Sequence, residues 1–238
     1  MNTIKARGLV IREYEAGESD KRLLLLCKGH GRVMVYARGV RKPTAKHLAS
    51  AQLFTYSDFV LAEGRGFYSL TQADVIESFY NLRTDYDRLR AAHLVAEVCE
   101  RTLWENVDCD RLLLLALKSL SRLAKGDMLP KQVTAVFLTR FFDFYGLRPQ
   151  VDECVACGLP LSEMKDGMYF GREGLLCDLH SAGGIAISPA AAAAFFHVVN
   201  SELIQAFRFN VLPEVIDDMH QGLKVLWDNY FEWGLRSL

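Results

Sequence analysis

The feature that most constrains the fold of this 238-residue chain is a change in the spacing of its apolar residues near residue 80. Before that point, short segments rich in branched and aromatic residues lie between glycine-containing turns, which is typical of β-strands. We expect strands at residues 3–15, 21–28, 31–39, 53–64 and 66–78. Five short strands in about 80 residues favour a small barrel, with the OB-fold as the natural candidate.

After residue 80 the apolar residues recur at helical spacing. Pro130 and Ser188 suit helix starts, and Gly126 and Gly146 suit helix ends. A segment rich in Gly, Pro and Cys interrupts this helical region. We expect helices at residues 85–105, 109–126, 130–146, 188–201 and 213–234.

Together these patterns predict an α+β multidomain protein. A five-stranded OB-fold barrel is expected over residues 1–80, and an all-helical domain over residues 81–238, interrupted by a zinc-finger-like insertion at residues 150–183. The apolar runs are far too short to cross a bilayer, and no signal peptide is visible. We therefore expect a cytoplasmic protein without a membrane partner.

The segments "CVACG" (154–158) and "CDLH" (177–180) form a C-x2-C pair and a C-x2-H pair with 19 residues between them. Each pair can direct two ligands from one tight turn, and three thiolates with one imidazole complete a tetrahedron around Zn²⁺. Because all four positions are filled by protein ligands, the ion would be structural. We predict one zinc ion bound by Cys154, Cys157, Cys177 and His180.

An alternative assigns Cys154 and Cys157 to a redox dithiol and leaves the second pair unrelated. The ligand spacing of the second pair, and the lack of a thioredoxin-like βαβ pattern around the first, argue against that reading. The three isolated cysteines are expected to be buried as small apolar residues: Cys27, Cys99 and Cys109.

The net charge of −1 hides a gradient along the chain. Residues 1–80 carry 12 Lys and Arg against 8 Asp and Glu, whereas residues 154–238 carry 5 against 10. Eight basic residues and no acid lie between Asp20 and Asp58. A field of one sign attracts phosphates over a Debye length of roughly 8–10 Å, whatever the net charge of the whole chain.

The strand expected at "RVMVYAR" (32–38) has Val33, Val35 and Ala37 on one face. Its other face carries arginine and tyrosine, which combine phosphate partners with a platform for base stacking. A basic loop follows directly. The alternative is a solvated barrel edge whose lysines prevent edge pairing. We predict contacts to nucleic acid at Arg32, Tyr36, Arg38, Arg41, Lys42 and Lys46.

No motif supports catalysis, because the chain has no Walker or dinucleotide-binding loop and no Ser or Cys with a supporting base. We expect no enzymatic activity. One aromatic cluster could be core or, in part, an exposed groove for a partner: Trp227, Tyr230, Phe231 and Trp233. The rival to a DNA-binding protein is therefore a zinc-stabilised protein-interaction adaptor without direct DNA binding.

Four stretches of the chain, taken in order, resemble the bacterial recombination-mediator family RecO. They are "KARGLVIREYEAGESDKRLLLL", "ARGVRKPTAKHLASAQLFTYSDF", "FFDFYGLRP" and "CVACG…CDLH". The resemblance covers essentially the whole length. It implies an N-terminal OB-fold, a helical body and a zinc-finger-like insertion.

The resemblance also implies a DNA repair protein that acts without enzymatic turnover in the cytoplasm, in association with the nucleoid. Such a protein binds single- and double-stranded DNA, anneals complementary strands, and works with RecR and RecF to load RecA onto DNA coated by single-stranded-DNA-binding protein. It also engages the acidic C-terminal tail of that coating protein. By position, the basic residues Arg32, Arg38, Arg41, Lys42 and Lys46 would contact DNA. The three clustered cysteines would match the family's metal ligands, although the family often has a fourth cysteine where this chain has His180.

Overall fold

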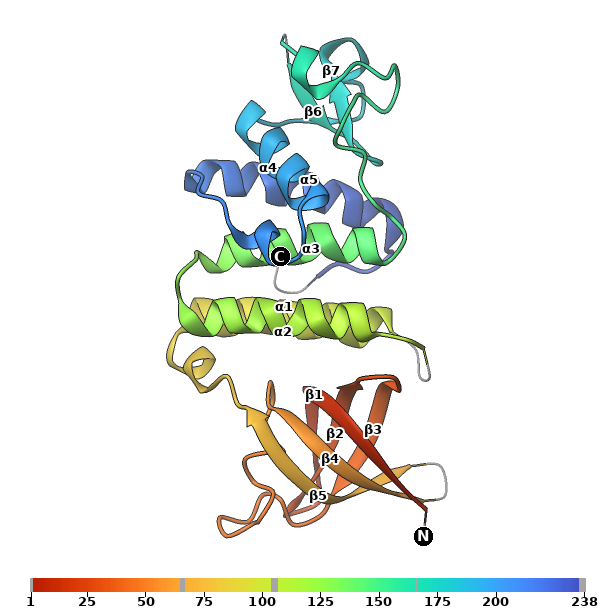
Figure 1. Ribbon diagram of the computed structural model, residues 1–238, viewed down its shortest axis with the longest axis vertical. Helices are drawn as coiled ribbons and strands as arrows, with labels where there is room; N and C mark the ends of the chain where they lie inside the picture. The colour runs from red at the N-terminus through yellow and green to blue at the C-terminus, as the bar shows by residue number, and fades with distance from the viewer. Residues whose placement is uncertain (1, 65–66, 104–106, 166, 236–238) are drawn as a thin grey trace. The chain divides into compact units, whose positions relative to one another are not determined.

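A computed structural model describes residues 2–64, 67–103, 107–165 and 167–235 of the chain. The chain divides into two compact units, Met1–Asp127 and Met128–Leu238. Within the described residues, the first unit holds a barrel with helices, and the second holds helices with a small sheet (Figure 1). The domain ranges expected from the sequence, 1–80 and 81–238 with an insertion at 150–183, stay a prediction.

Five strands close the barrel of the first unit in the order β1-β2-β3-β5-β4. They are β1 Thr3–Ala16, β2 Asp20–Cys27, β3 Gly31–Ala37, β4 Tyr56–Glu63 and β5 Tyr68–Glu77. Neighbouring strands are antiparallel except β3 and β5, which run parallel and pair at Val35–Tyr68 and Tyr36–Ser69. The expected five-stranded, OB-like barrel followed by a helical region is confirmed.

The interior of the barrel follows the period-2 pattern of the sequence. Along β3, buried and half-buried residues alternate, so Val33, Val35 and Ala37 point into the core as expected. The run "LLLL" of β2 breaks the alternation, because Leu24 and Leu26 on its outer face are also buried. Helices α1 (Tyr86–Thr102) and α2 (Asp110–Lys125) pack against β1 and β2 and remove that outer face from water.

Local capping signals set the ends of these two helices. The side chain of Asp85 accepts a hydrogen bond from the Arg88 N–H at the start of α1, which satisfies one of the free donors of the first turn. At the end of α2, Gly126 has a φ of +69°, a left-handed conformation that glycine adopts without steric cost, and its N–H binds the Arg122 carbonyl. The expected stop at Gly126 is confirmed.

The second unit consists of three longer helices and a small sheet within its described residues. The helices are α3 Pro130–Phe144, α4 Pro189–Asn200 and α5 Pro213–Tyr230, and the sheet has the order β7-β6-β8, with β6 Met168–Phe170, β7 Leu175–Cys177 and β8 Ile185–Ala186. Short 3-10 helices lie at Leu161–Glu163 (η2), Asp178–His180 (η3) and Gln205–Phe207 (η4) in this unit, and at Tyr80–Thr84 (η1) in the first unit.

Aromatic packing attaches the small sheet to the helices of the second unit. The ring of Phe170 on β6 stacks on Phe195 of α4 with centroids 4.4 Å apart. Gly222 on α5 permits this approach, because a Cβ there would come within 3.0 Å of the Phe170 ring. The glycine in "MHQGLKV" thus serves close packing rather than a turn.

The C-terminal aromatic cluster is mostly core. Trp227 is 2% exposed, and its ring stacks on Phe231 with centroids 4.4 Å apart. Helix α5 ends at Tyr230, short of the expected residue 234, and the chain then turns back so that the Trp227 indole N–H donates to the Trp233 carbonyl at 2.8 Å. Phe231 and Trp233 are half-buried, and Tyr230 is the most exposed member at 38%.

One buried arginine ties α3 to the end of α4. The Arg140 Nη1 donates to the carbonyls of Val198, Val199 and Ser201, and it lies 3.5 Å from Asp143. These carbonyls lie in or just beyond the last turn of α4, where carbonyl groups have no N–H donor within the helix. The arginine therefore acts as a C-terminal cap supplied by another helix.

We expect Arg140→Met to lower the free energy of unfolding by about 2–4 kcal/mol, because buried carbonyls lose their donor. Chemical denaturation measures the change. Arg208→Met is the matched control, since Arg208 is an exposed arginine of the same unit and should change stability by less than about 0.5 kcal/mol. Equal effects of the two substitutions would contradict the capping role of Arg140.

Among the described residues, no helix combines the length and the apolar character needed to span a membrane.

Candidate nucleic-acid interface and candidate metal centre

The first pair of metal-ligand candidates lies on a tight knuckle. The N–H of Cys154 binds the Leu159 carbonyl, and the N–H of Gly158 binds the Cys154 carbonyl, both at 2.8 Å. Gly158 has a φ of +72°, so the turn that follows Cys157 requires a residue that tolerates the left-handed region. The sequence "CVACG" therefore folds the two thiols back toward one point.

The second pair follows a short hairpin. Strands β6 and β7 are antiparallel, with Met168 opposite Cys177. Cys177 is the last residue of β7, and His180 ends the 3-10 helix η3 that follows. One helical turn between them brings the thiol and the imidazole to the same side.

The four side chains converge. Their ligand atoms all lie within 4.8 Å of one another, with Cys157 Sγ 3.8 Å from Cys177 Sγ and Cys177 Sγ 3.2 Å from His180 Nδ1. A tetrahedral site with metal–sulfur bonds of about 2.3 Å separates its thiolates by about 3.8 Å. The donor set and its spacing fit one metal ion.

The electrostatics of the cluster favour a thiolate at Cys154. Burial disfavours the charged sulfur, but backbone N–H groups of Cys177, Cys157 and Ala156 outweigh burial and lower the pKa of Cys154 to about 6. One of these contacts is the Cys177 N–H, 3.4 Å from Cys154 Sγ. At Cys177, burial and the neighbouring thiols raise the pKa instead. A metal ion requires deprotonated sulfur, and the cluster already prepares one such ligand.

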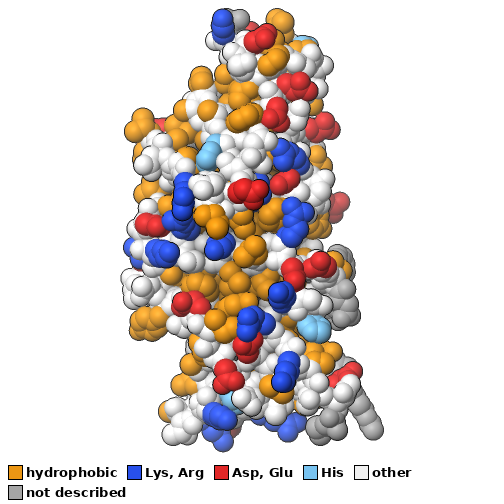
Figure 2. All heavy atoms as spheres, in the orientation of Figure 1, with side chains coloured by type: hydrophobic (Ala, Val, Ile, Leu, Met, Phe, Trp, Pro, Cys, Tyr) orange, Lys and Arg blue, Asp and Glu red, His pale blue; other side chains and the backbone are white. Residues whose placement is uncertain are grey.

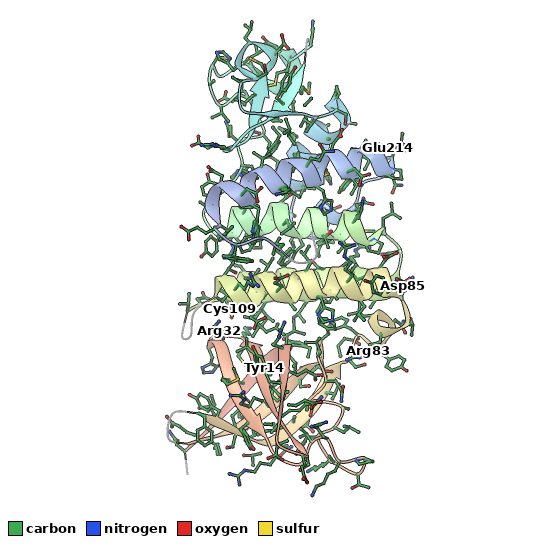
Figure 3. All side chains as sticks on the ribbon, turned by 180° about the vertical axis from the view of Figure 1, so that it is seen from behind. Tyr14, Arg32, Arg83, Asp85, Cys109 and Glu214 are labelled. Carbon is green, nitrogen blue, oxygen red and sulfur yellow. The ribbon has the colours of Figure 1, made fainter. Side chains whose placement is uncertain are left out.

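Two residues of the expected nucleic-acid surface are engaged within the first unit. Arg32 donates to the Glu100 carbonyl in the last turn of α1 at 2.9 Å, and both Arg32 and Tyr14 lie on barrel strands (Figure 3). Tyr36 donates through its hydroxyl to Asp20 at 2.6 Å. That hydrogen bond, followed by burial, raises the pKa of Tyr36, and it holds the pKa of the Asp20 carboxyl below its usual value.

The remaining expected residues lie on the connection between β3 and β4, residues 38–55, which we call the basic connection. It contains successive turns rather than a helix, closed by hydrogen bonds such as Ala45 N–H to the Lys42 carbonyl at 2.9 Å. Val40 and Ala51 anchor it in the barrel core. The cations that this leaves exposed are Arg38, Lys42 and Lys46.

Arg41 differs from these three cations because it is tied to the hairpin between β1 and β2. Residues 13–20, "EYEAGESD", form what we call the acidic hairpin. Arg41 Nη2 lies 3.1 Å from Glu15 Oε1, and Arg41 Nη1 donates to the Gly17 carbonyl at 3.3 Å. The stretch between Asp20 and Asp58 is free of acids in the sequence, but strand pairing brings acids of the acidic hairpin beside it. Figure 2 likewise shows cationic and acidic side chains interspersed over the visible face of the barrel.

The structure also assembles a row of residues that the sequence reasoning did not single out. Tyr14 on β1 lies opposite Arg22 on β2, and Arg22 lies opposite Tyr36 on β3. The guanidinium carbons of Arg12 and Arg22 lie 5.7 and 5.8 Å from the centre of the Tyr14 ring, within cation–π range. Alternation predicts the face of Tyr36 on β3, but a register shift between Val10 and Arg12 interrupts the alternation on β1. Only the register between strands reveals the row.

Comparisons with known proteins agree with this architecture. Two family models match, "Recombination protein O N terminal" over residues 1–79 and "Recombination protein O C terminal" over residues 83–238. The chain is 37% identical over 224 residues to the DNA repair protein RecO of Acetivibrio thermocellus, covering 92% of this chain and 88% of that protein. It is 32% identical over 233 residues to the protein of the same name from Heliobacterium modesticaldum, covering 94% and 84%.

Proposed function

This chain belongs to the RecO family of DNA repair proteins, and we propose that it is a DNA-binding recombination mediator without enzymatic turnover. In this role it binds single- and double-stranded DNA and anneals complementary strands. With RecR and RecF it helps to load RecA onto DNA coated by single-stranded-DNA-binding protein, whose acidic tail it also engages. It would act in the cytoplasm at the nucleoid.

The observation that carries the proposal is that exposed cations and an arginine–tyrosine row occur together on one barrel. Arg38, Lys42 and Lys46 are exposed on an anchored connection, and salt bridges among the described residues involve none of the three. Such cations neutralise phosphates without reading base sequence. Annealing needs this, since strand repulsion must be screened while base edges stay free to pair.

The expected contacts contribute unequally in this proposal. Arg38, Lys42 and Lys46 bind phosphates directly. Tyr36 lies opposite Arg22 and takes part through its ring, while its hydroxyl donates to Asp20. Arg32 acts mainly by holding the end of α1 against the barrel.

For the metal centre we propose zinc, bound by Cys154, Cys157, Cys177 and His180. The tetrahedral spacing and the three sulfur donors support zinc over harder cations, which prefer oxygen. With four protein ligands the ion would fix the knuckle to the hairpin and take no part in a reaction.

Titration of a fluorescein-labelled oligo(dT) with the full chain at 50 and 200 mM salt tests the proposed function. We expect saturable binding whose affinity falls about 10-fold or more over that range, as the release of several counterions requires. The rival, a zinc-stabilised adaptor, predicts no measurable affinity at either salt concentration. That result would overturn the mediator assignment.

A further inference from the structure

A cleft of about 300 Å³ lies at one end of the barrel, between the acidic hairpin and the basic connection. Its polar lining consists of two cations and two acids with an amide and a phenol: Lys21, Arg41, Glu13, Glu15, Gln52 and Tyr14. Through Arg41, Leu48 and Gln52 the cleft borders the basic connection that we propose for DNA. Its charges are arranged as two separate ion pairs.

The two pairs differ in exposure. Lys21 Nζ lies 2.8 Å from Glu13, and its side chain is only 12% exposed. It is also 3.4 Å from the Ala51 carbonyl, so this pair is part of the packed barrel end. The pair between Arg41 and Glu15 is open to solvent, with Glu15 74% exposed. An exposed pair is worth about 0–1 kcal/mol, so Glu15 can be replaced by another anion at low cost.

Arg41 keeps its place without Glu15. The backbone N–H of Arg41 donates to the Ser19 carbonyl at 2.9 Å, and the side-chain Nη1 donates to the Gly17 carbonyl at 3.3 Å. A guanidinium has five N–H donors in a fixed fork, which suits a phosphate oxygen pair as well as a carboxylate. The backbone of the hairpin therefore holds a cation ready for an incoming phosphate.

We propose that this cleft is a phosphate subsite for the DNA backbone, in which a phosphate group displaces Glu15 from Arg41. The inference rests on the proposed function and deepens it. Glu15 competes with the phosphate for one guanidinium, so the strand is held by a contact that exchanges readily. Exchange of this kind lets a mediator release the duplex once annealing is complete.

The test compares Glu15→Gln with Glu18→Gln in the oligo(dT) titration at 50 mM salt. Both variants remove one acid from the same hairpin, but Glu18 has no ion pair among the described residues. Because both substitutions replace one glutamate with glutamine, they raise the net charge of the protein equally, and only the ion pair with Arg41 distinguishes them. We expect Glu15→Gln to bind about two- to fivefold more tightly than Glu18→Gln, the range that an exposed ion pair of up to about 1 kcal/mol permits.

A second comparison in an Arg41→Gln background isolates the mechanism. There, Glu15→Gln and Glu18→Gln should have equal affinities, because the competed cation is gone. Equal or weaker binding of Glu15→Gln relative to Glu18→Gln in the otherwise unchanged protein would overturn the subsite. If the unchanged protein binds no oligo(dT), the proposed function itself fails, a result distinct from binding that is indifferent to Glu15. Equal melting temperatures of the variants confirm that they are folded.

Discussion

Replacing Arg38, Lys42 and Lys46 together with glutamine is expected to weaken binding of single-stranded DNA by about 10- to 100-fold at low salt. The three side chains are exposed cations on one anchored connection, and their loss removes phosphate contacts without disturbing the core. The slope of log affinity against log salt should shrink by about 2, since each single-strand contact contributes about 0.7. Fluorescence titrations at several salt concentrations measure both quantities.

The control for this variant is Lys5→Gln, Lys28→Gln and Arg90→Gln. These residues are also one arginine and two lysines, all exposed, in the same unit. Lys5 and Lys28 lie at the opposite ends of β1 and β2 from the acidic hairpin. The net charge changes equally, so a difference between the triple variants reports position rather than total charge. Identical affinities and slopes would refute the assignment of the basic connection to DNA.

Cys157→Ser is expected to abolish stoichiometric metal binding and to destabilise the second unit. The Cys157 side chain is exposed, so its replacement by serine costs little packing, and any large loss of stability must come from the metal. Structural zinc sites contribute folding free energy directly. We expect zinc to fall from one ion per chain to near zero, and the melting temperature to fall by about 10 °C, equivalent to a few kcal/mol. Elemental analysis and calorimetry measure these changes.

Cys99→Ala is the matched thiol control, because Cys99 is buried outside the cluster. It should keep one zinc ion per chain even if packing in the first unit suffers. A redox role for Cys154 and Cys157 predicts a different outcome, in which the unchanged protein carries no metal and its two thiols form a reversible disulfide. A metal-free, fully stable preparation of the unchanged protein would contradict the zinc assignment.

The sequence was sufficient for the features that depend on local order. Turn glycines mark the ends of strands, and the alternation along β3 defines that strand because it buries one face. The Cys/His cluster was also predictable, since a C-x2-C pair and a C-x2-H pair each place two candidate ligands on one turn. Only the meeting of the two turns depended on the fold. Helix ends followed from residues such as Gly126 and Ser188, whose capping is local.

Features that depend on pairing between strands could not be read from the sequence. Arg32 and Tyr36 were expected to face ligand, yet each finds a partner within the first unit, Glu100 and Asp20. The stretch without acids between Asp20 and Asp58 lies beside the acidic hairpin, because the hairpin that joins β1 to β2 contacts the basic connection through Glu15 and Arg41. Tyr14 lies beside Arg22 because of the register between β1 and β2. A single sequence contains no direct record of such neighbours.

The short junction between β3 and β5 bears on how the barrel assembles. The other strand pairs extend over most of a strand, and the β1–β2, β2–β3 and β4–β5 pairs join neighbours in the sequence. The parallel junction depends on Val35–Tyr68 and Tyr36–Ser69, contacts that require closure of the whole intervening chain. Because local hairpins form before distant contacts compensate the entropy of loop closure, this junction and the still more distant β1–β4 pairing are expected to form late. The junction has the fewer residue pairs to stabilise it once formed. Until the β3–β5 junction forms, the apolar inner faces of β3 and β5 remain exposed to water. We therefore expect misassembly and aggregation to compete most strongly with folding at that stage.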